Sequence, residues 1–174
     1  MKKFITAIVA AALTTVGASA SAGTFAEHER LFQTLQSIGI DVQINPKGCD
    51  GSSMGWYRPY TQVVAICQQN GSPGGPQVRW TAEDLDTLRH EAHHVVQDCR
   101  DGILNAQLHY IYKDPIELAK NSLSRNTIGW ILSDEGYGTL SNHMQVLELE
   151  AFSVAALNDP TEQIRDIATY CTRG

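Results

Sequence analysis

Four cysteines, Cys49, Cys67, Cys99 and Cys171, place the strongest restraint on the fold of this chain. An even number of cysteines in an exported chain predicts two disulfides, for which three pairings are possible. We favour Cys49–Cys67 and Cys99–Cys171, because the first pair closes a local hairpin and the second ties the C-terminal helix to the middle of the chain. A four-cysteine zinc site is the alternative, but the four are widely scattered and form no Cys-x-x-Cys pair.

The first 22 residues are expected to be a secretory signal peptide rather than part of the folded domain. Lys2 and Lys3 form a basic start, residues 4–16 are almost entirely apolar, and the small residues 18–22 offer a cleavage site. No apolar run approaches the roughly 18 residues that a membrane-spanning helix requires. We therefore expect one monomeric domain over residues 23–174, located in the periplasm or the medium of a bacterium, with no integral membrane span.

The composition fits a folded domain and excludes several classes of partner. Hydrophobic residues make up 43% of the chain and charged residues 18%, which excludes an intrinsically disordered protein. Loss of Lys2 and Lys3 with the signal peptide changes the formal net charge from -6 to -8. An acidic chain without clusters of Lys and Arg binds nucleic acids and anionic membranes poorly, so we expect neither as a partner.

The hydrophobic pattern predicts an α+β fold, in which a small antiparallel sheet precedes a helical C-terminal half. A capping box at Thr24 begins a helix that ends near Gly39, and another at Thr81 begins a helix that runs to about Cys99. Strands are expected at residues 40–45 and 60–67, and further helices at residues 115–122, 123–132, 141–157 and 160–171.

The second of these helices contains His90-Glu91-Ala92-His93-His94, which matches the pattern His-Glu-x-x-His. Two histidines four positions apart on a helix differ by about 40° in direction and about 6 Å in height. One zinc ion can therefore bind both imidazoles at about 2.0–2.1 Å. Glu91 lies beside the pair, where it can take a proton from a water that zinc has acidified, and the hydroxide then attacks a polarised carbonyl.

The same helix carries an apolar stripe that we expect to face the core. The stripe consists of Leu85, Leu88, Ala92, Val95, Val96 and Cys99. His90 and His94 lie nearly opposite it, which fits either a ligand pair or an ordinary solvated face. His93 points away from that pair and is expected to be exposed.

The motif helix, the strand before it and one later helix resemble those of the zincin metallopeptidases. This resemblance implies a zincin-like fold, zinc as the cofactor, and Glu91 as the general base. It also implies a peptide or protein substrate that lies antiparallel to the strand at residues 60–67 and adds a strand to its edge. Gln97 and Arg100 stand where metzincins have Gly and a third His, which excludes that subgroup.

Gluzincins take their third zinc ligand from a Glu on a later helix, and Glu148-Leu149-Glu150-Ala151 fits their Glu-x-x-Ala pattern. The resemblance therefore implies Glu148 as the ligand, with Glu150 as an alternative. Phe152 departs from the pattern, because the family usually has an Asp there that orients a ligand histidine. Asp98 and Asn142 are candidates for that orienting role here.

A second stretch offers another candidate for the third ligand. Asp134-Glu135-Gly136-Tyr137-Gly138 resembles the end of the aspzincin motif, in which the Asp binds zinc. The two glycines also fit a turn that ends a helix, and we favour that interpretation. Zincins commonly stabilise the oxyanion of the tetrahedral intermediate with a Tyr or a His, and Tyr137 and His143 are the candidates because both shortly precede Glu148.

The sequence thus predicts an exported, disulfide-bonded zinc metallopeptidase. His90, His94 and Glu148 would bind zinc, and Glu91 would be the general base. The alternative is a secreted binding or inhibitory module whose metal site is vestigial or structural. A third hypothesis keeps zinc hydrolysis but replaces the peptide bond with another amide.

Overall fold

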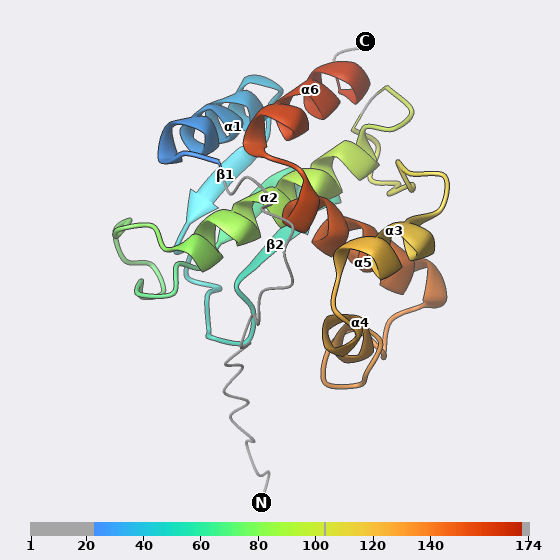
Figure 1. The fold of residues 1–174 in the computed structure, drawn as a ribbon. Coiled ribbons are helices and arrows are strands. Elements are labelled where there is room, and N and C mark those ends of the chain that lie inside the picture. Colours follow the sequence, from blue (N-terminus) through green and yellow to red (C-terminus); the bar gives the residue numbers. More distant parts are fainter. Residues whose placement is uncertain (1–22, 103, 172–174) are drawn as a thin grey trace, which may run out of the picture.

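The computed structural model describes residues 23–102 and 104–171, so the signal peptide expected at residues 1–22 lies outside it (Figure 1). Its elements are α1 (Phe25–Ser37), β1 (Asp41–Ile44), β2 (Gly55–Arg58), a 3-10 turn (Pro59–Thr61), β3 (Val63–Ile66), α2 (Ala82–Asp98), α3 (Pro115–Ser122), α4 (Arg125–Ile131), α5 (Asn142–Leu157) and α6 (Pro160–Tyr170). The predicted α+β class is confirmed. Both predicted capping boxes are present, and the helices begin and end close to their predicted positions.

The three-stranded sheet differs from the prediction in two ways. The prediction of an antiparallel sheet was wrong, because β1 pairs with β3 in parallel and only β2 pairs with β3 antiparallel. β3 is the central strand, so the strand expected at residues 60–67 does not form an edge of the sheet. The edge beside it is β2, a four-residue strand in a stretch for which no strand was predicted.

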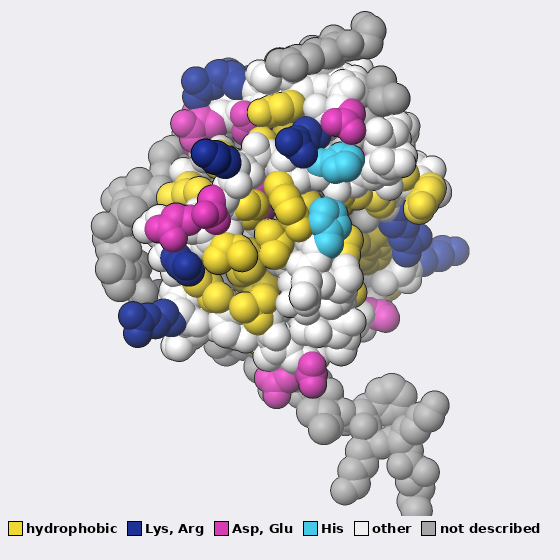
Figure 2. All heavy atoms as spheres, turned by 90° about the vertical axis from the view of Figure 1, so that its right-hand side faces the viewer, with side chains coloured by type: hydrophobic (Ala, Val, Ile, Leu, Met, Phe, Trp, Pro, Cys, Tyr) yellow, Lys and Arg dark blue, Asp and Glu magenta, His cyan; other side chains and the backbone are white. Residues whose placement is uncertain are grey.

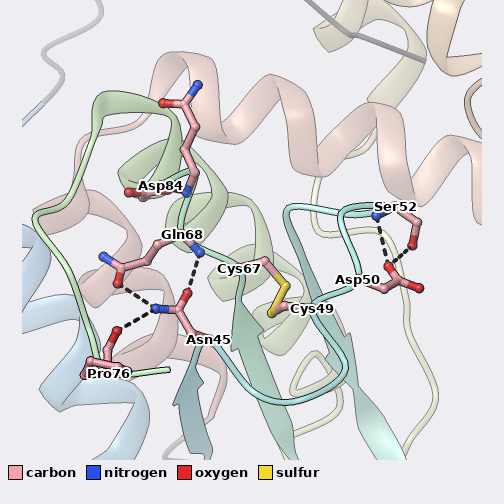
Figure 3. The surroundings of a disulfide bond; sticks show 9 residues. Asn45, Cys49, Asp50, Ser52, Cys67, Gln68, Pro76 and Asp84 are labelled. Carbon is pink, nitrogen blue, oxygen red and sulfur yellow. Dashed lines mark hydrogen bonds between the residues drawn. A yellow bond between two sulfur atoms is a disulfide. The ribbon is translucent and has the colours of Figure 1, made fainter. Parts of the chain in front are cut away.

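Both predicted disulfides are confirmed, Cys49–Cys67 and Cys99–Cys171. Figure 3 shows the first, which joins the loop after β1 to the residue that follows β3. Beside it, Asn45 Oδ1 accepts a hydrogen bond from the backbone N–H of Gln68 at 2.8 Å, and Asn45 Nδ2 donates to the Pro76 carbonyl at 3.1 Å. The bridge and this network together fix the carboxyl ends of β1 and β3.

Two hydrophobic clusters form the core, and α2 and α5 bring them together. The first cluster joins α1, α2, α6 and the sheet, and includes Leu31, Leu35, Ile66, Leu88 and Ile167. The second joins α3, α4 and α5 through Ala119, Ile131 and Leu149, with Leu123, Ile128, Trp130, Tyr137 and Phe152 packed against them. α5 packs against α2, so the polar residues of these two helices meet at the junction of the clusters.

α2 crosses the centre of the molecule, between the sheet and the C-terminal helices (Figure 1). Its predicted apolar stripe is buried apart from Leu85, which is half-buried. The opposite face of α2 is buried as well, because α5 covers it. The expectation that His93 is exposed was therefore wrong, since its side chain is fully buried.

The face formed by the C-terminal helices carries exposed apolar surface. Figure 2 shows hydrophobic side chains gathered near the middle of this face, with two histidines beside them. Ile116, Leu132 and Leu140 are exposed large hydrophobic residues of this half of the chain. Within the described ranges, no helix is both long and apolar enough to cross a membrane.

Candidate metal centre

The two histidines of the motif face each other across one turn of α2. Their Nε2 atoms lie 3.1 Å apart and their ring centroids 4.7 Å apart, with the ring planes nearly perpendicular. The helix that carries them begins at a fixed place, because Thr81 caps it and Asp84 accepts the backbone N–H groups of both Thr81 and Gln69. The local sequence therefore sets both the spacing of the histidines and their position relative to the sheet.

Glu148 of α5 completes the group that the sequence predicts. Its Oε2 atom lies 3.2 Å from His90 Nε2, and its Oε1 atom lies 3.5 Å from His94 Nε2. Glu148 is buried, and α5 reaches the histidines because it packs directly against α2. Two nitrogen atoms and one carboxylate thus converge on one small region between the helices.

The spacing of these atoms fits a tetrahedral metal. Ligands that bind zinc at about 2.0–2.1 Å in a tetrahedron lie about 3.3 Å from one another. Here the two Nε2 atoms lie 3.1 Å apart, and each lies near a different oxygen of Glu148, at 3.2 Å for His90 and 3.5 Å for His94. Glu148 Oε2 is buried and makes no hydrogen bond of good geometry in the described residues, so it has a lone pair left for another partner. The residues present therefore fit a zinc ion, as two imidazoles and a carboxylate commonly do.

Glu91 offers a second carboxylate to the same region. Ligand atoms of His90, Glu91 and His94 all lie within 4.8 Å of one another, so these residues also form a group that could hold a metal ion. We favour Glu148 over Glu91 as the third ligand, because the Glu148 carboxylate faces both Nε2 atoms within 3.5 Å. Glu91 also lies against β2, since its Cγ atom would be 3.3 Å from a Cβ atom added at Gly55.

The two carboxylates differ in their affinity for protons. Burial raises the pKa of Glu91, and the positive charges of His90 and His94 only partly oppose this effect. Burial also acts to raise the pKa of Glu148, but the positive charges and close contacts of His94 and His90 hold that pKa far below its usual range. Two acids whose pKa values differ in this way suit two roles: Glu148, with the lower pKa, suits an anionic ligand, and Glu91, with the raised pKa, suits a proton acceptor.

The same carboxylates shift the pKa of His94 upward. Burial is the largest single effect and would lower its pKa, but Glu148, Glu91 and Gln97 together raise the pKa of His94 to about 9. Metal binding must therefore displace a proton from this group, as is usual for histidine ligands.

Of the two candidates for oxyanion stabilisation, Tyr137 lies near the metal centre. Burial raises the pKa of Tyr137, and the charges of Glu148 and Glu91 raise it further, so its hydroxyl lies within the field of both carboxylates. Its ring packs on Phe152, whose own ring lies 4.4 Å from that of His90.

His143 lies on the exposed first turn of α5 and is hydrogen-bonded elsewhere. Its ring contacts the Tyr110 hydroxyl at 2.7 Å and the Leu108 carbonyl at 3.2 Å. In the described residues these are its hydrogen bonds, and none joins it to the metal centre. Tyr137 is therefore the better placed of the two candidates.

The two alternative third ligands have other surroundings. Asp134 is exposed in the turn after α4, where Gly136 and Gly138 donate backbone hydrogen bonds to the Ser133 carbonyl, as expected of a helix-ending turn. Glu150 is fully buried and accepts hydrogen bonds from His93 at 2.9 Å and from Gln97 at 3.1 Å. The structure brings neither carboxylate to the His90–His94 pair.

The side chain that contacts Nδ1 of His94 was not singled out in the sequence. Gln97 Oε1 accepts a hydrogen bond from His94 Nδ1 at 2.7 Å. Asp98, a candidate for orienting a ligand histidine, accepts instead from the Tyr57 hydroxyl and from the backbone of the following loop. The sequence does contain one signal for this contact: Gln97 lies three residues after His94 and therefore on the same side of the helix.

No protein-family model matches this chain, and neither the curated proteins nor the solved structures include a significant match. Any assignment of function therefore rests on the sequence motif and on the geometry of this site.

Proposed function

We propose that this protein is an exported zinc metallopeptidase, with His90, His94 and Glu148 as the zinc ligands and Glu91 as the general base. The observation that carries the proposal is the convergence of Glu148, 54 positions after His94, on the two Nε2 atoms of the motif. A surface histidine pair would have no reason to be buried against a carboxylate from another helix. The two disulfides agree with an oxidising compartment outside the cytoplasm.

Bound zinc would supply Lewis acidity, which acidifies water and polarises a substrate carbonyl. Glu91 would accept the proton of the attacking water and pass it to the leaving amine, a task that suits a carboxyl group whose pKa burial has raised. Tyr137 would donate a hydrogen bond to the oxyanion, since its ring packs on Phe152, which in turn contacts His90.

The substrate peptide would pair with β2 rather than with the strand proposed from the sequence. β2 is an edge of the described sheet, whereas β3 has a neighbour on each side. β2 also runs past the proposed general base, because a Cβ atom added at Gly55 would lie 3.3 Å from Glu91 Cγ. An extended peptide added to this edge would therefore pass close to Glu91 and the zinc ligands.

One observation favours a second candidate function, a binding module with a structural metal. The four charged groups of the centre are nearly enclosed, with relative exposures of 8% for His90, 5% for Glu91, 6% for His94 and 7% for Glu148. Structural zinc sites are typically closed, whereas catalytic sites keep one position open. The presence of Glu91 argues for catalysis, since a structural site has no use for a general base.

Replacement of Glu91 separates the two functions. The Glu91→Gln variant is expected to retain zinc and to lose cleavage of a peptide library, because the amide cannot accept a proton. Glu83→Gln makes the same chemical change on the exposed first turn of α2 and serves as the matched control. Cleavage by wild-type protein that persists undiminished in Glu91→Gln would contradict the mechanism, and zinc binding without any cleavage by the wild type would favour the binding module.

A further inference from the structure

Gln97 is a fully buried residue of α2 whose side chain joins this helix to α5. Its Nε2 atom donates hydrogen bonds to the Leu147 carbonyl and to Glu150 Oε1, both at 3.1 Å. A backbone carbonyl can only accept, so these contacts fix which end of the amide is nitrogen. The amide oxygen must then face His94 Nδ1, 2.7 Å away.

This orientation determines the tautomer of His94. Because Gln97 Oε1 can only accept, His94 Nδ1 carries the hydrogen and donates it. In the neutral imidazole the lone pair is then on Nε2, which is the atom that faces His90 Nε2 and Glu148. The same hydrogen bond restrains rotation of the ring about its bond to Cβ.

Glu150 holds Gln97 in place from the far side. Besides Gln97, its carboxylate accepts hydrogen bonds from His93 Nε2 at 2.9 Å and from the backbone N–H groups of Ile111 and Tyr112 at 3.0 Å each. Glu150 therefore links α5, α2 and the segment that follows α2. A carboxylate with this many donors is a rigid anchor for the amide.

The other histidine of the pair has no equivalent support. His90 Nδ1 is buried and makes no hydrogen bond to any described residue, and the Phe152 ring packs against the imidazole. The hydrogen-bonded support of the centre is thus one-sided, on His94 alone.

We propose that Gln97, anchored by Glu150, is the positioning residue of the metal centre: it holds His94 in the tautomer and orientation that direct Nε2 to zinc. The inference rests on the proposed function, because it requires that His90, His94 and Glu148 bind zinc. Removal of a residue that hydrogen-bonds to a metal-binding histidine typically weakens metal affinity by about 10- to 100-fold.

The test compares two buried glutamines in the full-length mature protein. Gln97→Met keeps the size of the side chain and removes its hydrogen bonds to His94 and Glu150. Gln163→Met, the matched control on α6, removes a hydrogen bond of 2.8 Å to the Arg89 carbonyl of the same helix α2, but touches no ligand. We expect competition with a zinc chelator to give an affinity about 10- to 100-fold weaker for Gln97→Met and near the wild-type value for Gln163→Met.

A spectroscopic measurement on the wild type keeps the proposal testable even if Gln97→Met does not fold. In proton–nitrogen spectra of the zinc-loaded protein, the hydrogen-bonded Nδ1 proton of His94 should appear downfield of that of His90. Three results would overturn this inference alone. Gln97→Met could bind zinc as tightly as the wild type, or both variants could be weakened equally. The Nδ1 protons of His94 and His90 could also appear at the same position in the spectrum of the wild type. Wild-type protein that binds no zinc would overturn the proposed function and this inference with it.

Discussion

Gly55 of β2 packs so tightly against Thr87 of α2 that a Cβ atom at residue 55 would lie 2.6 Å from Thr87 Cγ2. The same atom would lie 2.8 Å from the Ala65 carbonyl and 3.3 Å from Glu91 Cγ. The edge strand, the motif helix and the proposed general base therefore meet at a position where only glycine fits. In the proposed function, this contact would set how closely a peptide paired with β2 approaches Glu91.

Replacement of Gly55 by Ala should disturb both stability and turnover. β2 would have to move away from α2, at a cost of roughly 1–3 kcal/mol, and the distance between β2 and Glu91 would increase. Denaturant unfolding and peptide cleavage measure the two effects. Gly129→Ala is the control, since a Cβ there meets nothing within 4 Å; equal behaviour of the two variants would contradict the close packing of β2 on α2.

Tyr137→Phe should lower kcat by about 100-fold with little change in KM, because the lost hydroxyl would act only in the transition state. His143→Ala should leave kcat close to the wild-type value, since the ring of His143 is hydrogen-bonded to Tyr110 and Leu108. Steady-state kinetics on one peptide substrate decide between the two residues. The reverse order of effects would assign oxyanion stabilisation to His143.

The two disulfides should contribute unequally to stability. The chain-entropy relation gives about 3 kcal/mol for Cys49–Cys67, which spans 18 positions, and about 4 kcal/mol for Cys99–Cys171, which spans 72. Paired Cys→Ala variants, unfolded in urea, measure each loss in the free energy of unfolding. A larger loss on removal of Cys49–Cys67 would show that local strain or packing, rather than chain entropy, dominates.

His28 should make the protein less stable in mild acid. Burial lowers its pKa below the ordinary value of 6.5, although the Thr24 carbonyl and the charges of Asp86 and Glu27 oppose the shift. The unfolded chain therefore binds the proton more readily, so stability is full above about pH 6.5 and falls as the pH drops below it.

The His28→Gln variant measures this contribution. The fall in Tm between about pH 7.5 and about pH 5.5 should be smaller in the variant than in the wild type. Part of the fall should remain, because burial lowers the pKa of His93 in the same sense. An identical fall in both proteins would contradict the assignment to His28.

The elements predicted well from the sequence are those with local signals. The capping boxes at Thr24 and Thr81 depend on residues three positions apart, and both helices begin where these boxes lie. The sheet was predicted less well because strand order depends on pairing between distant segments. β2 has four residues and no marked alternation, so nothing local distinguishes it from a turn.

In the candidate site, too, the features with local sequence signals were predicted and those that depend on packing between distant segments were not. The His-Glu-x-x-His spacing places His90, Glu91 and His94 on one side of a helix, and this could be predicted from the helical repeat. The burial of His93 and the role of Gln97 could not, because both depend on α5 packing over a face of α2 that the sequence pattern assigns to solvent. Glu150 likewise faces His93 because of that packing.

The zinc content of the purified mature protein tests the central claim most directly. Elemental mass spectrometry after mild dialysis should find about one zinc per chain in the wild type, and much less in Glu148→Ala and His94→Ala. That result would support the ligand set His90, His94 and Glu148. Wild-type protein that contains no zinc, even after zinc has been offered, would contradict the metal centre and with it the proposed peptidase.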